Sequence, residues 1–255
     1  MTSTYQYDFR GLRVFLTGGA RGMGKGIAEA FADWGATVGI TDSNEAGAAD
    51  TAQAIVTRGG QAMSHHIDVT DEHSVQKALD VFCEFAGGID LSINAAGVLS
   101  VHSVVDMDVK EWRRVLDVNA TGTFIVSRTA ASAMIAQQTS GSIVCIASIG
   151  GKLGSAGLAH YSASKFAVVG FVQSFAHELG DHGIRVNAVC PGTVHTQMID
   201  DLAEGWAMSV EDLLALQIQN RAQTPAEIAL GIAGLHVNEA VTGQSLNVDG
   251  GTVFY

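Results

Sequence analysis

Tyr161 and Lys165 are the two residues whose types and spacing could do chemistry together. They stand four residues apart in the stretch Y-S-A-S-K, and on a helix this spacing places both side chains on one face, one turn apart. A free tyrosine gives up its proton only near pH ~10, but a lysine ammonium close by favours the phenolate and lowers that pKa. The pair could therefore exchange a proton with a substrate hydroxyl.

Ser148 is a third candidate for the same chemistry. It follows the apolar run I-V-C-I-A at 143–147, which predicts a buried strand. A serine at the end of a strand can point its hydroxyl at the oxygen that Tyr161 serves. Three such groups around one oxygen suit the interconversion of an alcohol and a carbonyl.

A glycine-rich stretch supplies the first element that could position a cofactor. The run 12–17 predicts a strand, G-G-A-R-G-M-G predicts a tight loop, and the residues after it show a helical pattern. This is the context of a dinucleotide-binding motif, in which Gly18, Gly22 and Gly24 let the backbone approach a pyrophosphate at the helix N-terminus. A second predicted strand ends at Asp42, where a carboxylate can bind the adenosine ribose hydroxyls.

Strand and helix patterns alternate along the whole chain. Strands are predicted at 12–17, 36–41, 61–67, 89–93, 141–148, 184–190 and 243–248. Helical patterns follow the glycine loop and lie at 46–58, 71–85, 108–137, 158–179 and 225–236. The alternation predicts one α/β domain over residues 1–255, a doubly wound fold with a seven-stranded parallel sheet and helices on both faces. Ligands of such sheets bind beyond the carboxyl ends of the strands, where the sequence places Gly18, Asp42, Asp68, Asn94, Ser148 and Pro191.

These motifs together resemble the short-chain dehydrogenase/reductase family. The matching features are Ser148 with Y-S-A-S-K, the T-G-x-x-x-G-x-G spacing of the glycine loop, N-A-A-G at 94–97 and D-G-G at 249–251, all in the family's order. The resemblance implies a Rossmann-like fold. It also implies an oxidoreductase that transfers a hydride between a secondary alcohol and a nicotinamide cofactor, with Tyr161 as general acid and base.

The resemblance also implies roles for individual residues. Ser148 would bond the developing alkoxide, and Lys165 would bond the nicotinamide ribose. Asn119 would kink its helix and hold a water linked to Lys165. The implied catalytic residues are Asn119, Ser148, Tyr161 and Lys165. The implied cofactor-binding residues are Gly18, Arg21, Gly22, Met23, Gly24, Asp42, Asp68, Val69, Asn94, Ala95, Gly97, Tyr161, Lys165, Pro191, Gly192, Val194 and Thr196.

Two of these residues have a second interpretation. Asp68, with Val69, would border the adenine in the family, or it would only cap the turn before the helix at 71–85. Asn94 is expected to have a structural task, bonding neighbouring backbone.

The sequence favours NAD over NADP as the cofactor. Asp42 would repel a 2′-phosphate, whereas relatives with a basic residue at the position of Arg21 often use it to hold that phosphate. A carboxylate directly at the ribose costs the phosphate more than a flexible arginine recovers, so we expect NAD.

The substrate is the least specified part of the interpretation. Candidate substrate-binding residues are Ser148, Gly150, Lys152, His160, Tyr161 and His195, with a variable lid over about 195–220. Lys152 has the alternative of a solvated lysine. The resemblance favours polyol, diol or cyclic-alcohol dehydrogenases. A 3-oxoacyl-[acyl-carrier-protein] reductase is the first alternative, and a scaffold that binds the dinucleotide without turnover is the second.

Composition limits the partners. The net charge of −12 argues against nucleic acid and anionic membranes. No apolar run reaches ~18 residues and no basic segment precedes an apolar one at the N-terminus, so we expect a soluble cytoplasmic protein. Cys83, Cys145 and Cys190 match no zinc pattern, and we expect no metal. A small-residue stripe on the helix at 158–179, together with the resemblance, implies a homo-oligomer, a homotetramer built as a dimer of dimers.

Overall fold

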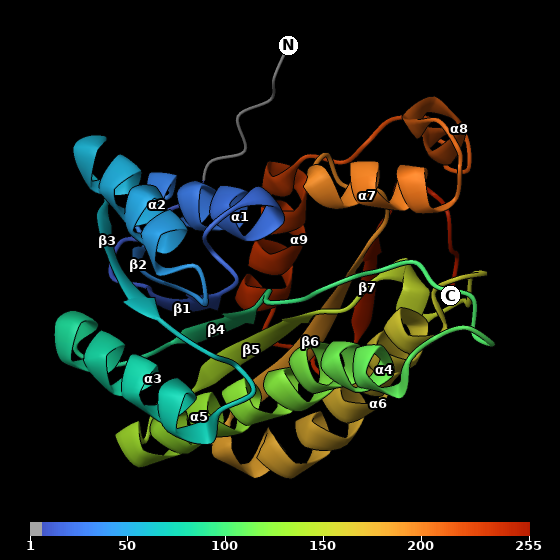
Figure 1. Ribbon diagram of the computed structural model, residues 1–255. Coiled ribbons are helices and arrows are strands. Elements are labelled where there is room, and N and C mark those ends of the chain that lie inside the picture. The colour runs from blue at the N-terminus through green and yellow to red at the C-terminus, as the bar shows by residue number, and fades with distance from the viewer. Residues whose placement is uncertain (1–6) are drawn as a thin grey trace.

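Seven parallel strands form one sheet in the order β3-β2-β1-β4-β5-β6-β7 (Figure 1). The computed structural model describes residues 7–255. The strands are β1 (Arg13–Thr17), β2 (Thr37–Asp42), β3 (Gln61–His66), β4 (Leu91–Asn94), β5 (Gly141–Ile146), β6 (Ile184–Pro191) and β7 (Ser245–Val248). Every neighbouring pair is parallel. Because β1 lies between β2 and β4, the chain crosses the centre of the sheet after β3, which confirms the predicted doubly wound fold.

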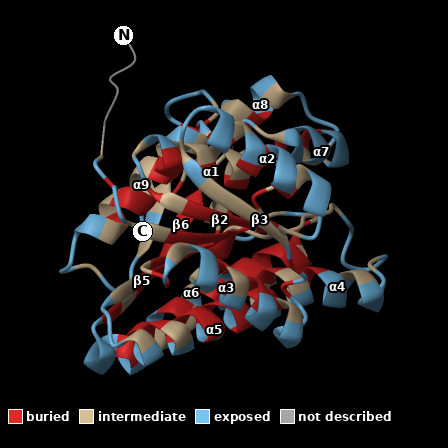
Figure 2. Ribbon diagram, turned by 90° about the vertical axis from the view of Figure 1, so that its left-hand side faces the viewer, coloured by how far each residue is buried: buried red, intermediate tan, exposed pale blue. Residues whose placement is uncertain are grey.

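Helices cover both faces of the sheet (Figure 1). One face carries α1 (Gly22–Asp33), α2 (Glu45–Thr57) and α9 (Pro225–Val237). The other carries α3 (Glu72–Ala86), α5 (Gly122–Gln137) and α6 (Ala159–Leu179). Each layer buries its own apolar core, one around Phe31 and Ile228 and the other around Phe82 and Val172. Figure 2 shows the buried residues running through the sheet between the two helix layers.

Three of the helices that cover the sheet begin at a residue whose side chain caps the helix. Asn44 and Asp71 accept main-chain N–H groups at the starts of α2 and α3. Thr224 and Glu227 form a reciprocal capping box at α9, with Pro225 as its first residue. Such caps satisfy N–H groups that have no partner inside the helix. The predicted bounds of these three helices agree with the structure to within one residue.

The long helical region predicted after the fourth strand is interrupted. α4 (Val109–Leu116) and α5 are joined by a π-helical turn over Asp117–Thr121. Asn119 lies fully buried in this turn. Its side-chain amide is hydrogen-bonded to both the N–H and the carbonyl of Val98. The wider turn brings Asn119 to the loop after β4, and π turns are frequent at functional sites.

The chain between β6 and α9 forms two short helices, at the upper right of Figure 1. They are α7 (Gln197–Gly205) and α8 (Val210–Leu214), and both fall in the predicted lid. Within residues 7–255, no helix combines the length and apolar character needed to cross a membrane.

Candidate active site

The four residues expected to be catalytic come from three parts of the chain that meet beyond β5. Ser148 follows β5, Tyr161 and Lys165 lie on α6, and Asn119 lies in the π turn. A Cβ added at Gly97 would lie 3.4 Å from Asn119 Oδ1 and 3.6 Å from Lys165 Nζ. The turn after β4 therefore adjoins both side chains.

Tyr161 is buried beside the turn that follows Ser148. A Cβ added at Gly150 would lie 3.2 Å from Tyr161 Cε1 and 3.4 Å from Ser148 Oγ. Burial raises the pKa of Tyr161 above its ordinary value of 10.0, and a hydrogen bond with Ser148 acts in the opposite direction. The net shift of this pKa is upward because the loss of hydration is the larger effect. The lowering of the Tyr161 pKa expected from Lys165 stays a prediction.

Lys165 is buried as well, and its ammonium is held by the main chain. Its Nζ donates to the carbonyl of Ile146 at 2.9 Å and lies 5.7 Å from the centroid of the Tyr161 ring. Burial lowers the pKa of Lys165 from 10.5 to about 8. The lysine can therefore take up or release a proton near neutral pH, as a proton relay requires.

Ser148 has its hydroxyl proton free for the site. Its Oγ accepts the N–H of Gly150 at 3.0 Å, and a hydroxyl has one proton of its own to donate. With that acceptor position used by the backbone, Ser148 can donate to Tyr161 or to a substrate oxygen. Donor and acceptor groups thus meet where an alcohol oxygen would need them.

Both polar atoms of the Asn119 side-chain amide are hydrogen-bonded inside the protein. Its Oδ1 accepts the N–H of Val98 at 2.8 Å, while Nδ2 donates to the carbonyl of Val98 at 2.9 Å and to Ser164 Oγ at 3.0 Å. These bonds join the π turn to the loop after β4 and to α6. The side chain fixes the site, while the water link implied by the resemblance remains a prediction.

The glycine loop between β1 and α1 forms a cradle with no room for side chains. A Cβ added at Gly18 would lie 2.7 Å from the Cα of Ala96, and one added at Gly24 would lie 2.0 Å from the carbonyl oxygen of Gly18. Gly18 and Gly22 also have positive φ, which glycine adopts readily. The side chain of Arg21, the residue at the start of α1, does not cap the helix, which leaves its first N–H groups to a pyrophosphate.

Asp42 ends β2 beside this loop, at the predicted ribose position. Its Oδ2 accepts the N–H of Ala20 at 3.0 Å and its Oδ1 accepts the N–H of Asn44 at 2.9 Å. These bonds fix the carboxylate against the loop. Arg21 is exposed and forms no ion pair with the rest of the chain from residue 7 onward.

Asp68 and Asn94 both have structural partners. Asp68 Oδ1 accepts the main-chain N–H and the hydroxyl of Thr70, so it closes the turn before α3 while Asp71 caps the helix itself. Asn94 is buried, accepting from Ser92 Oγ at 2.8 Å and donating to Ser127 Oγ at 2.7 Å. The structural task expected for Asn94 is present, but its side-chain partners are side chains rather than backbone.

The turn after β6 lies next to the glycine loop. A Cβ added at Gly22 would lie 3.4 Å from Thr196 Cγ2, and Thr196 Oγ1 donates to the carbonyl of Val194 at 3.4 Å. Gly192 meets Asp249 so closely that an added Cβ would lie 2.8 Å from its Cα. This end of the sheet also contains four further cofactor candidates, Met23, Val69, Ala95 and Pro191.

The predicted lid packs onto the apolar cluster that contains Tyr161. Leu202 and Trp206 of the lid adjoin the cluster that contains Tyr161 and Leu158, and Trp206 Nε1 donates to the carbonyl of Ala156 at 2.9 Å. The predicted lid residues Met198, Met208 and His195 are exposed. The lid therefore covers the Tyr161 side of the site with Leu202 and Trp206.

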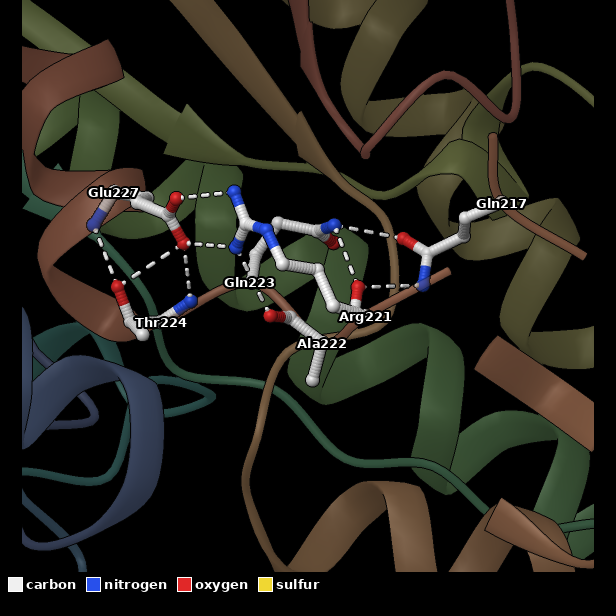
Figure 3. A network of polar contacts seen from close by, with 6 residues as sticks. All are labelled: Gln217, Arg221, Ala222, Gln223, Thr224 and Glu227. Atoms are coloured by element: carbon white, nitrogen blue, oxygen red, sulfur yellow. Dashed lines mark hydrogen bonds and ion pairs between the residues drawn. The ribbon is translucent and has the colours of Figure 1, made fainter. Parts of the chain in front are cut away.

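A polar network fixes the base of the lid (Figure 3). The buried amides of Gln217 and Gln223 are bonded at 2.8 Å, and Gln217 Nε2 also donates to the carbonyl of Arg221 at 3.1 Å. Arg221 forms a two-point ion pair with Glu227 at the start of α9. A Cβ added at Gly250 would lie 2.6 Å from Gln223 Nε2, so the network also touches the end of β7.

Two substrate-binding predictions are corrected by the structure. Lys152 Nζ donates to the main-chain oxygens of Ser245 and Tyr255, at 2.9 and 2.6 Å, so it holds the C-terminal tail and does not face the site. His160 is fully buried, with Nε2 2.9 Å from Ser100 Oγ. It faces the loop after β4 rather than an open pocket, because helix residues one position apart point in different directions.

Sequence reasoning missed four buried or half-buried polar residues around the site. They are Ser100, Glu111, Gln217 and Gln223. Each is an ordinary polar residue in a loop or amphipathic stretch, and no spacing rule relates Ser100 to a histidine 60 positions later. No signal in the sequence could have identified them. Among residues 7–255, no group of three or more His, Cys, Asp or Glu side chains could hold a metal ion.

The family model, the curated relatives and the solved structure that match this chain all point to the same protein family. The family model described as short chain dehydrogenase matches residues 13–206. A 3-oxoacyl-[acyl-carrier-protein] reductase of Synechocystis sp. is 34% identical over 246 residues, covering 95% of this chain and 97% of the relative. Meso-2,3-butanediol dehydrogenase of Serratia marcescens is 36% identical over 241 residues, 93% of each chain. The crystal structure of a short-chain type dehydrogenase/reductase from Mycobacterium marinum, 33% identical, matches 96% of this chain and 97% of its own with a TM-score of 0.90.

Proposed function

The chain belongs to the short-chain dehydrogenase family of oxidoreductases, and we propose that it transfers a hydride between a secondary alcohol and NAD. The observation that carries this proposal is the meeting of Ser148, Tyr161 and Lys165 in a buried site that adjoins the glycine cradle. When bound, the nicotinamide supplies the hydride acceptor. The side chains then have only to move a proton and stabilise the charge on oxygen.

The proton chemistry follows from the bonds described above. In oxidation the phenolate form of Tyr161 takes the hydroxyl proton, while Ser148 keeps its own proton and donates a hydrogen bond to the oxygen as charge develops there. Lys165 lies within 5.7 Å of the Tyr161 ring and has a pKa of about 8. It can therefore pass the proton on near neutral pH. Reduction runs through the same groups in reverse.

Asp42 supports NAD as the cofactor. Two main-chain N–H groups hold its carboxylate beside the glycine loop, so it cannot turn aside easily from a 2′-phosphate. Arg21 is exposed and would have to be ordered to offset that repulsion. The 2′-hydroxyl of NAD can donate a hydrogen bond to this fixed carboxylate, whereas the 2′-phosphate of NADP would be repelled by it.

The substrate class is proposed from two observations. The similarity to meso-2,3-butanediol dehydrogenase supports a diol, polyol or cyclic alcohol. The similarity to a 3-oxoacyl-[acyl-carrier-protein] reductase favours the alternative, an oxoacyl thioester reduced to a hydroxyacyl thioester. The net charge of −12 argues against an acidic carrier as partner, so we favour the small alcohol.

An absorbance assay of the reduced cofactor tests the cofactor and the substrate class together. Polyols, vicinal diols and cyclic secondary alcohols are offered at alkaline pH with NAD and NADP in parallel. We expect turnover with NAD on one alcohol group. Turnover with NADP alone would overturn the assignment of Asp42, and turnover only on 3-oxoacyl thioesters would select the alternative.

Tyr161→Phe tests the proton transfer. The phenyl ring keeps the packing but has no proton to exchange, so we expect turnover to fall by at least about 100-fold. NADH binding, followed by protein fluorescence, should stay within about two-fold, as the cradle is untouched. Turnover near the wild-type rate would refute the role of Tyr161. Loss of NADH binding would instead show that the substitution disrupts the cofactor site.

A further inference from the structure

A chain of polar contacts links α4 to the first turn of α6, next to Tyr161. Ser100, in the loop after β4, lies at its centre. Ser100 Oγ donates to Glu111 Oε1 and lies 2.9 Å from His160 Nε2. Glu111 in turn accepts two hydrogen bonds from Arg114, at 2.7 and 2.6 Å. Three separate elements are therefore joined through one serine hydroxyl.

The chemistry of these groups sets the protonation of His160. The Arg114 guanidinium lowers the pKa of Glu111 to about 2, so Glu111 only accepts and Ser100 donates its single proton to it. Ser100 can then only accept from His160, which places the ring proton on Nε2. The other nitrogen, Nδ1, is buried and has no hydrogen-bond partner among residues 7–255. His102 is the other titratable side chain at the ring, with centroids 6.1 Å apart.

The segment 98–102 that contains Ser100 forms a wall of the site. Val98 is bonded to Asn119, and the N–H of His102 donates to the carbonyl of Gly157 at 2.9 Å. Val101 packs against the lid, where a Cβ added at Gly205 would lie 2.5 Å from it. Val98, Leu99 and Val101 also pack on the cluster that contains Tyr161. The wall segment therefore touches the π turn, α6 and the lid.

We propose that His160 is a positioning residue that holds the wall segment 98–102 through Ser100 and so sets the affinity for the alcohol substrate. This rests on the proposed function. The glycine loop and Asp42 are held by other bonds, from Ala20 and Asn44 and through contact with Ala96. Loss of the His160 bond should therefore weaken substrate binding and leave the dinucleotide site intact.

His160→Leu and His160→Gln form a matched pair that tests this role. Gln can place an N–H near the position of Nε2 and restore the bond to Ser100, whereas Leu cannot. We expect KM for the alcohol to rise about ten-fold in His160→Leu, the size of one buried hydrogen bond lost with its partner left unpaired. We expect kcat to change by less than about three-fold, NADH binding to stay unchanged, and Gln to restore most of KM. Equal KM in the two variants, or a matching loss of NADH affinity, would overturn the proposal.

Ser100→Ala supplies a second route if His160→Leu folds poorly. It should raise KM by a similar factor, and the double variant Ser100→Ala/His160→Leu should add little to either single change, because both remove the same bond. Additive effects would show that the two residues act separately and would refute the proposal.

A measurement without substrate separates this proposal from the proposed function. In wild-type protein, ring-nitrogen NMR should show His160 with a protonated Nε2 and a bare Nδ1, and Ser100→Ala should shift the Nε2 signal. A protonated Nδ1, or a spectrum unaffected by Ser100→Ala, would refute the network even if the alcohols are turned over. Absence of turnover with an intact His160 signal would instead overturn the proposed function alone.

Discussion

Burial dominates the ionisation of the two residues at the centre of the site. Burial raises the pKa of Tyr161 and lowers the pKa of Lys165, because each group loses hydration in its charged form. Burial therefore shifts each group toward its neutral form. The site is suited to hold a proton on Tyr161 until a charged or strongly bonding ligand changes the balance.

Lys165→Met should remove a pH dependence of stability. The folded-state pKa of Lys165 is about 8 and the unfolded value is about 10.5, so from pH 8 to 10.5 the unfolded chain binds more protons at this site. The wild-type free energy of unfolding therefore gains from this group as pH rises through that window. Relative to Lys165→Met, wild type should gain roughly 3 kcal/mol across it.

Urea denaturation of both proteins at intervals from pH 7 to 10.5 measures this difference. Comparing the two proteins cancels the contribution of the tyrosines and thiols that also titrate there. Lys77→Met, at an exposed lysine of α3, is the control and should give a difference from wild type that is nearly independent of pH. A pH-independent difference for Lys165→Met as well would show that burial does not shift this lysine.

At the level of single residues, sequence spacing identified the groups that share an element or end a strand. Tyr161 and Lys165 were predictable because helical periodicity alone places them together. Lys152 was not, since its direction is set by Ser245 and Tyr255, about a hundred positions later. The partner of His160 lies 60 positions earlier. Such pairings depend on the assembled sheet, which periodicity does not describe.

At the level of elements, alternation and caps were enough to predict the sheet and most helices. The inner strands β1, β5 and β6 contain the apolar runs typical of strands that are covered on both faces. The edge strands β3 and β7 are more polar, and the number of strands followed from the alternation with helices. The family resemblance predicted a kink at Asn119, where the π turn lies. Periodicity alone could not predict that turn, because Asn119 is hydrogen-bonded there to Val98 in another part of the chain. The two helices of the lid, α7 and α8, were not predicted either, because their formation depends on packing against other parts of the chain.

Gly250→Ala should loosen the base of the lid. Gly250 has φ of +63°, and an added Cβ would lie 2.6 Å from Gln223 Nε2 and 3.1 Å from Gln217 Oε1. The strained backbone and the displaced amides should lower the free energy of unfolding by about 1–3 kcal/mol. KM for the alcohol should rise, because the amide pair anchors the lid.

Gly234→Ala is the control for this substitution. Gly234 lies within α9, and an added Cβ meets nothing within 4 Å, so alanine there should raise stability by up to about 1 kcal/mol. Chemical denaturation and steady-state kinetics of both variants make the comparison. Equal stability of the two variants would mean that the amide pair yields to the added carbon without cost.

At the level of the whole molecule, the outer face of α5 and α6 carries exposed phenylalanine side chains, which are unfavourable on a surface in contact with water. Phe124 on α5 and Phe166 on α6 are 42% and 47% exposed, and Phe124 packs edge-on against Phe171. Ala163, Ala167 and Gly170 lie along α6 near Phe166 and permit close approach of another helix. We propose a second copy of the chain as the partner for this face, in line with the expected dimer of dimers.

Phe166→Glu should weaken that assembly. A stable interface between copies buries on the order of 1,200 Å² or more, and a charge at its centre would be desolvated without a partner. Sedimentation equilibrium should give wild type a mass of at least two chains and Phe166→Glu a smaller one. Phe85→Glu replaces a phenylalanine that is 52% exposed on α3, outside α5 and α6, and should leave the mass unchanged. A monomeric wild type would refute the interface. An equal loss of mass in both variants would mean that added negative charge on a chain of net charge −12 separates the copies from a distance, because charge repulsion acts between whole molecules.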